Sequence, residues 1–226
     1  MCFSASASFG ASALLIPTGI YCLREAMTND RAYLLISTWP LFFGIQQAVE
    51  GLLWLGIASN ELTLINTASL CFLFFSHFFW LFWAPFSAFS LETKKSLRIV
   101  LMIFTLIGFF YGALLYFPLL LEKSWVRIGV VNSSIYYGTK FIFNDLVPKN
   151  FSFVTYAIII LVPLLISSNQ RVNFLGSLIC LSVIITYIMF SHAFISVWCF
   201  FAAVLSLYLL YTTNKLARFN SRQIQP

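Results

Sequence analysis

Charged side chains are scarce in this sequence: Asp, Glu, Lys and Arg together make up only 9% of its 226 residues. A soluble domain carries about 25% charged residues. So few charges cannot cover a surface that faces water, and the mean hydropathy of +0.92 points the same way. The composition therefore excludes an ordinary soluble domain and predicts a protein whose main solvent is the lipid bilayer.

Patterns of cysteine, basic and catalytic residues are missing as well. The chain has five cysteines, none of them in a C-x-x-C pair, and most lie in apolar segments, where cysteine behaves as a small hydrophobic residue. The net charge of +6 is not gathered into a basic cluster, so we expect no nucleic-acid partner. No G-x-S-x-G, P-loop, H-E-x-x-H or dinucleotide motif occurs. No basic segment precedes the first apolar run, which predicts a retained span and not a cleaved signal peptide.

What the sequence does have is long apolar runs, about seven of them near the roughly 20 residues that cross a bilayer. We predict an all-α integral membrane protein, a single bundle formed by residues 1–213 and followed by a cytoplasmic, disordered tail at 214–226. The expected spans are 4–22, 33–56, 63–89, 99–121, 151–166, 174–190 and 194–212. Pro85 marks an expected break in the third span. Because only two polar residues separate the last two runs, one long kinked helix and six spans in total is the alternative.

The positions of Lys and Arg predict the orientation, because basic loops stay in the cytoplasm. Most basic residues fall in the loops on one side and in the tail, whereas the other side has them only in the long loop 122–150. We expect the N-terminus outside, the C-terminus in the cytoplasm, and a multi-pass protein of the inner (plasma) membrane. In the external loop, β-branched and aromatic runs flank the turn-prone residues 132–134, which predicts a β-hairpin or an interfacial segment at the headgroups.

The stretch FGIQQAVEGLLW, residues 43–54, puts polar side chains inside an apolar run. At helical spacing Gln46, Gln47 and Glu50 share one face, and Trp54 extends it by one turn. A charged carboxylate facing lipid costs about 2.5 kcal/mol or more. The stripe is therefore expected to face the bundle interior and to form an outward-facing polar pocket around Glu50. The alternative is that Glu50 only holds neighbouring helices together by hydrogen bonds.

Histidine is also rare, with only His77 and His192 in the chain. His77 lies in an apolar span, where a lone histidine is most often a satisfied core residue, and it is a second candidate for the pocket. His192 is expected at an outer turn, and Cys2 and Ser4 lie near the same surface. Ser4 is a further candidate for the pocket. Cys2, Glu50, His77 and His192 are candidate metal ligands, because Cys, His and carboxylate bind zinc, although their spacing gives no support.

Three stretches of the chain resemble those of a known family. MCFSASASF opens the sequence, FGIQQAVEGLLW lies in the second span, and FISVWCFFAA lies in the last. Together they resemble an uncharacterised family of bacterial polytopic membrane proteins, over nearly the whole chain. The resemblance implies a bacterial inner membrane. It implies no activity, cofactor or catalytic residue.

The sequence leaves several functions open. The first is binding or transport of a small polar solute or cation near Glu50, and the apolar segment below Glu50 favours a blind pocket over a through-path. The alternative is a metal-dependent intramembrane hydrolase resembling alkaline ceramidase-like enzymes, with zinc activating water and Glu50 as general base. That family uses three zinc-binding histidines, more than this chain has. A haem held by His77 and His192 and a purely structural role are further alternatives. Expected partners are the bilayer, a solute, cation or lipid ligand, and a second copy of the chain.

Overall fold

The computed structural model describes residues 4–142, 149–190 and 193–215, and within them the chain is a bundle of apolar helices. Six helical runs are long and apolar enough to cross a membrane, and the shorter apolar helix α7 (Lys149–Ile166) packs among them. The six are α1 (Ala5–Asn29), α2 with α3 (Leu34–Ser37 and Trp39–Ser59), α4 with α5 (Leu62–Leu73 and Trp80–Leu91), α6 (Lys95–Leu121), α8 (Gln170–Phe190) and α9 (Phe194–Ser206). The predicted all-α, multi-spanning architecture is confirmed at this level.

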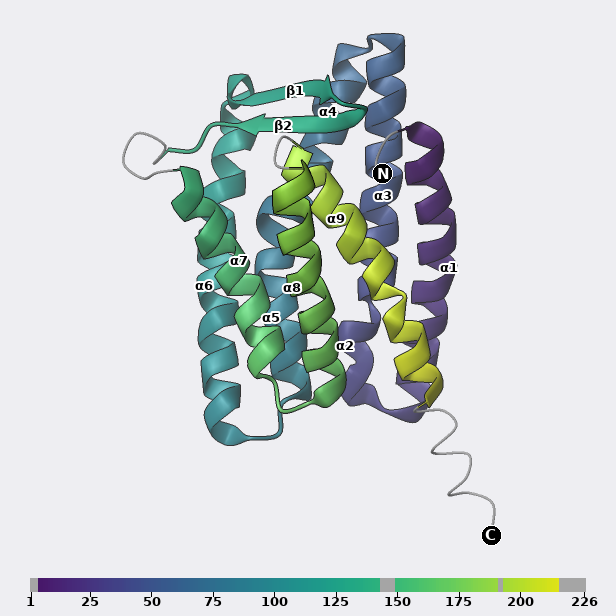
Figure 1. Cartoon of the computed structure of the whole chain (residues 1–226), viewed down its shortest axis with the longest axis vertical. Helices are drawn as coiled ribbons and strands as arrows, with labels where there is room; N and C mark the ends of the chain where they lie inside the picture. The colour runs from purple at the N-terminus through teal and green to yellow at the C-terminus, as the bar shows by residue number, and fades with distance from the viewer. Residues whose placement is uncertain (1–3, 143–148, 191–192, 216–226) are drawn as a thin grey trace.

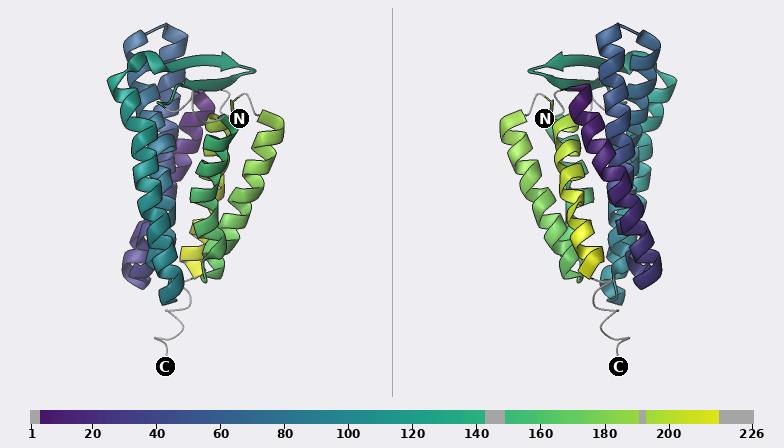
Figure 2. Two further views of the ribbon diagram at one scale, coloured as in Figure 1. Left: turned by 90° about the vertical axis from the view of Figure 1, so that its left-hand side faces the viewer. Right: turned by 90° about the vertical axis from the view of Figure 1, so that its right-hand side faces the viewer.

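A two-stranded antiparallel sheet lies across one end of the bundle (Figures 1 and 2). Strands β1 (Val126–Val131) and β2 (Ser134–Thr139) pair so that Val131 faces Ser134. The two loop residues between them, Asn132 and Ser133, both have positive φ, as a two-residue hairpin turn of type I′ requires. The ring of Tyr137 stacks on Phe72 of α4 at 4.6 Å, and this contact seats the hairpin on the helices. α1 begins at this end of the bundle, and α9 runs toward the opposite end (Figure 1).

Three details differ from the sequence-based expectations. The expected break at Pro85 is wrong, because α5 runs through Pro85; the irregular segment is instead the π-helix η2 (Phe74–Phe79), between α4 and α5. The alternative of one long kinked helix is also wrong, because α8 and α9 are separate helices that pack together. Asn214 and Lys215, assigned to the tail, extend the last helix, which resumes after Leu207. The rest of the predicted tail, 216–226, lies outside the described residues.

Tryptophan hydrogen bonds join the second and third spans. Each of three indole N–H groups on α3 or α5 donates to a polar side chain on the other run. The pairs are Trp39 to Ser87 at 3.0 Å, Trp80 to Gln46 at 2.7 Å and Trp83 to Thr38 at 2.9 Å. A buried indole N–H needs such a partner, and in an apolar interior these bonds fix the register of α3 against α5.

Helix α6 packs closely against the third span through two glycines. A Cβ atom at Gly108 would stand 1.9 Å from the carbonyl oxygen of Leu81, and one at Gly112 would stand 3.0 Å from Cα of Phe78. The two glycines form a G-x-x-x-G pattern, which allows close helix packing in membranes. This packing positions η2, which bears His77.

Candidate functional site

The π-helix carries the histidine that the sequence singles out. π-Helical turns occur mostly as short bulges within α-helices and are frequent at functional sites. Ser76 and His77 on η2 are 2% and 5% exposed, and the Ser76 hydroxyl lies 2.9 Å from Nδ1 of His77. The hydroxyl of Tyr156 on α7 donates to the Ser76 carbonyl. The π-helix is thereby tied to α7 at the residue next to the histidine.

A cavity of about 170 Å³ adjoins this segment, between η2, α6, α7, α9 and the end of β2. Most of its lining surface is apolar, but six of its twelve lining residues carry a polar or thiol group. The polar and thiol groups belong to Ser76, His77, Thr139, Ser152, Tyr156 and Cys199. An apolar cavity with a few convergent polar groups is the usual form of a small-molecule site.

A second polar cluster surrounds Glu50, on the interior faces of α3 and α9. Gln46, Gln47 and Glu50 are fully buried, so the stripe faces the bundle interior and not lipid. The Ser196 hydroxyl donates to Oε1 of Glu50 at 2.6 Å, and Nε2 of Gln47 approaches Oε2 at 3.4 Å. Oε1 of Gln46 accepts the Trp80 indole N–H. None of the residues of this stripe lines the large cavity, so the carboxylate lies behind its wall.

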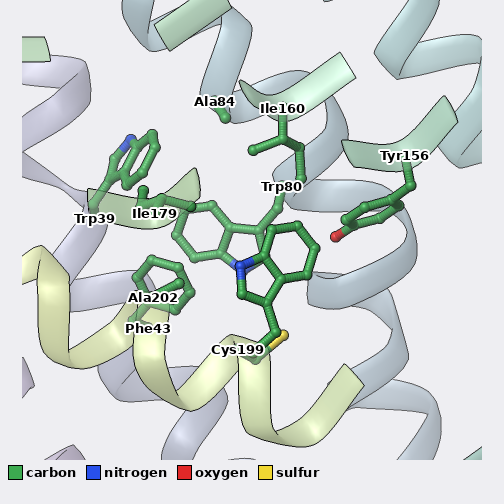
Figure 3. A pocket seen from close by; sticks show the side chains of 10 residues that line it. Trp39, Phe43, Trp80, Ala84, Tyr156, Ile160, Ile179, Cys199 and Ala202 are labelled. Carbon is green, nitrogen blue, oxygen red and sulfur yellow. The ribbon is translucent and has the colours of Figure 1, made fainter. Parts of the chain in front are cut away.

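Cys199 lies between the two groups. Its thiol is close enough to interact with the side chains of Gln46 and Glu50 in one group and of Tyr156 in the other. Cys199 lines the cavity beside His77 and also a smaller one of about 30 Å³ (Figure 3). Trp198 and Tyr156 line both cavities as well. The structure thus brings Glu50 and His77 into neighbouring clusters that share a wall, and not into one group.

The remaining candidates from the sequence have other positions. Ser4 accepts a hydrogen bond from the Ala7 amide and caps α1, and it lines neither cavity. Trp54 is half-buried on α3, and its Nε1 has no hydrogen-bond partner among the residues that the structure describes. Cys2 and His192 lie outside the described residues.

The candidate metal ligands from the sequence include those two residues. Within the described ranges, no three His, Cys, Asp or Glu side chains come together in a group that could hold a metal ion. Glu50 and His77 alone, in separate clusters, do not make the four-coordinate set that zinc takes. The zinc hypothesis therefore requires Cys2 or His192.

Sequence reasoning missed Tyr156, Ser196 and Cys199. Serine, tyrosine and cysteine are common in apolar helices, so nothing in their own spans distinguishes them. Ser196 and Cys199 do lie in FISVWCFFAA, one of the three stretches that carried the family resemblance. The signal that marks the two is their position three residues apart on one face of α9, where Ser196 bonds Glu50 and Cys199 lines both cavities.

These features define a multi-spanning helical membrane protein with a mainly apolar cavity beside a buried polar cluster. The chain belongs to the family of unknown function DUF6629, whose model matches residues 1–223. This agrees with the resemblance to an uncharacterised family; the bacterial inner membrane stays a prediction. No curated protein and no solved structure matches the chain.

Proposed function

We propose that the protein binds a small amphipathic molecule, an apolar body of about one aromatic ring bearing one hydroxyl, in the cavity beside His77. The observation that carries the proposal is the buried Ser76–His77 pair on the wall of a cavity of about 170 Å³ whose lining surface is mainly apolar. An apolar cavity of about 150 Å³ is large enough to hold benzene. The volume therefore suits a ring with a small substituent.

The hydrogen bonding of His77 supports a hydroxyl as the polar group. Among the described residues, the imidazole bonds only through Nδ1, to Ser76, which leaves Nε2 for an occupant of the cavity. Whether Nε2 donates or accepts depends on the tautomer. A hydroxyl can do either, so it satisfies both tautomers. A bare cation would meet a mostly apolar wall and lose its hydration without replacement, which argues against the solute first expected at Glu50.

The rest of the lining supports an aromatic body. Besides His77, five aromatic side chains line the cavity: Phe141, Phe153, Tyr156, Phe194 and Trp198. Phe153 and Phe194 meet edge to face with centroids 4.6 Å apart, the arrangement in which ring edges and faces attract. A bound ring would extend this packing.

The Glu50 cluster has a positioning role in this proposal. Its bond from Ser196 joins α3 to α9, and Trp198 and Cys199 on α9 form part of the cavity wall. The carboxylate acts on the ligand only through that wall. The sequence-based assignment of Glu50 as the direct binding group is thereby replaced by His77.

Phenol and toluene form the pair of probes that tests this function. We expect phenol to bind the purified protein in lipid nanodiscs about fivefold more tightly than toluene, because one hydrogen bond contributes about 1 kcal/mol. Equilibrium dialysis against empty nanodiscs gives the free aqueous concentration of each probe. His77→Phe is expected to remove the difference between the two probes.

Two neighbouring leucines on α6 provide the matched control. Leu115 lines the cavity, whereas Leu114 is 45% exposed on the outer face. Leu115→Phe fills part of the cavity and should weaken phenol binding at least tenfold, and Leu114→Phe should leave it unchanged. Equal phenol affinity in the two variants would show that phenol occupies another place, and the proposed function would then be wrong.

The metal-dependent hydrolase is the second candidate, supported by an imidazole that lines a cavity. Zinc content per chain, measured by mass spectrometry on the purified protein, separates the two functions. Because Glu50 and His77 belong to different clusters, we expect no stoichiometric zinc. One zinc per chain in the wild type, lost in both Glu50→Gln and His192→Ala, would place the hydrolase first.

A further inference from the structure

The smaller cavity next to the proposed ligand site has its own shape and chemistry. It measures about 30 Å³ and is lined by residues of α3, α5, α7, α8 and α9 (Figure 3). A water-sized group needs about 10–15 Å³ of such volume. The cavity therefore has room for about two groups of that size, the equivalent of an ethyl chain.

The surroundings of this cavity suit carbon better than water, and one indole N–H in its lining, that of Trp198, has no hydrogen-bond partner among the described residues. The indole N–H groups of Trp39 and Trp80 are used by Ser87 and Gln46, so they offer no bond to an occupant. The other side chains that line only this cavity, such as Phe43, Ala84, Ile160 and Ile179, are apolar. A water needs two to four polar partners, and apolar cavities stay dry.

Tyr156, Trp198 and Cys199 line both cavities, so the two cavities adjoin along these three side chains. We infer that the small cavity is a second subsite, which accepts a short, unbranched alkyl tail on the ring bound beside His77. This inference rests on the proposed function and adds a ligand class to it: phenols with a linear tail of about two carbons. A cavity of about 30 Å³ has room for about two carbons, so a branched group does not fit it.

A series of para-substituted phenols tests the subsite: phenol, 4-methylphenol, 4-ethylphenol, 4-propylphenol and 4-tert-butylphenol. Each buried methylene should tighten binding about fourfold. We expect the aqueous dissociation constant of the wild type to fall up to the ethyl compound and to stop falling at propyl. The tert-butyl compound should bind no better than phenol.

Three variants separate binding in the subsite from partitioning of the probes into lipid, because lipid partitioning is the same for every variant. Ala202 lines only the small cavity, so Ala202→Leu should abolish the gain from methyl and ethyl groups, with phenol as the internal reference. Ile179→Ala enlarges the same cavity and should move the optimum to propyl. Val204→Leu, at a position 43% exposed on α9, is the control and should behave as the wild type.

The outcomes distinguish the inference from the function on which it rests. If phenol binds but Ala202→Leu gives the same increments as the wild type, the tail lies elsewhere and the inference is wrong while the function stands. If phenol does not bind at all, both are wrong. A gain at ethyl that Ala202→Leu removes and Ile179→Ala extends supports both.

Discussion

Replacing Gly108 with alanine should lower the free energy of unfolding by about 3 kcal/mol or more, at the upper end of what overpacking a buried site costs. The added Cβ atom would stand 1.9 Å from the Leu81 carbonyl oxygen. Because that oxygen belongs to the backbone of α5, no change of side-chain rotamer relieves the overlap. Helix α6 would have to move away from the third span.

Pro85 explains why α6 comes so close at this point. In a regular helix the carbonyl of Leu81 accepts a hydrogen bond from the amide of residue 85, and proline has no amide hydrogen. The Cα hydrogens of a glycine can approach such a carbonyl and form a weak C–H···O contact, which recurs where helices pack closely. Pro85 and Gly108 therefore act as a pair. Pro85 leaves the Leu81 carbonyl without its helical donor, and Gly108 of α6 packs against that carbonyl, so that α5 continues through Pro85.

Two other glycines provide comparisons for the predicted effect of Gly108→Ala. A Cβ at Gly10 on α1 would meet nothing within 4 Å, so Gly10→Ala should cost nothing and gain up to about 1 kcal/mol from helix propensity. Gly112→Ala, with 3.0 Å to Cα of Phe78, should fall between the two and weaken phenol binding, because the contact lies beside His77. Unfolding midpoints in one detergent compare the three. A Gly108→Ala protein as stable as Gly10→Ala would contradict the tight α5–α6 contact.

The parts of this fold that sequence reasoning predicted follow from solvation alone. Lipid-spanning helices need long apolar runs, and a carboxylate in such a run must point inward; Glu50 does so, with its two glutamines. Hydropathy sets both outcomes locally, without knowledge of any partner. The G-x-x-x-G pattern of Gly108 and Gly112 was readable by the same kind of local rule but was overlooked.

The candidate site was beyond such rules because it is made of contacts between distant segments. Ser196 reaches Glu50 across 146 positions of sequence, and Tyr156 reaches Ser76 across 80. No sequence signal predicts the π-helix, since the residue types of FFSHFF are equally compatible with an α-helix. His77 and Glu50 belong to separate clusters because they lie on opposite sides of α9 residues such as Cys199.

Glu92 presents a second buried carboxylate, at the end of the bundle opposite the hairpin. It is 3% exposed and follows directly after α5. Oε1 accepts the amides of Thr93 and Lys94 and the hydroxyl of Ser168, and Oε2 accepts the amide of Ser168. One side chain thereby joins the loop between α5 and α6 to the loop between α7 and α8.

The expected result of Glu92→Gln is a loss of about 2–3 kcal/mol in the free energy of unfolding at pH 7, because hydrogen bonds to a charged group are strong and the new amide would face donors. The matched control is Glu122→Gln. Glu122 also accepts from a serine, Ser124, but it is exposed, so its change should stay within about 0.5 kcal/mol.

The pH dependence of the free energy of unfolding distinguishes an effect of the charge of Glu92 from an effect of its shape. Burial acts to raise the pKa of Glu92, but the four hydrogen bonds from Ser168, Lys94 and Thr93 outweigh it and hold the pKa below the ordinary value, which is about 4.3. A carboxyl with a lowered folded pKa contributes stability that is full above the unfolded pKa and is lost as the pH falls through the folded one. The advantage of the wild type over Glu92→Gln should therefore be complete at neutral pH and shrink below about pH 4. A difference that stays constant across that range would mean that Glu92 acts by its shape alone, and that its charge does not hold the two loops together.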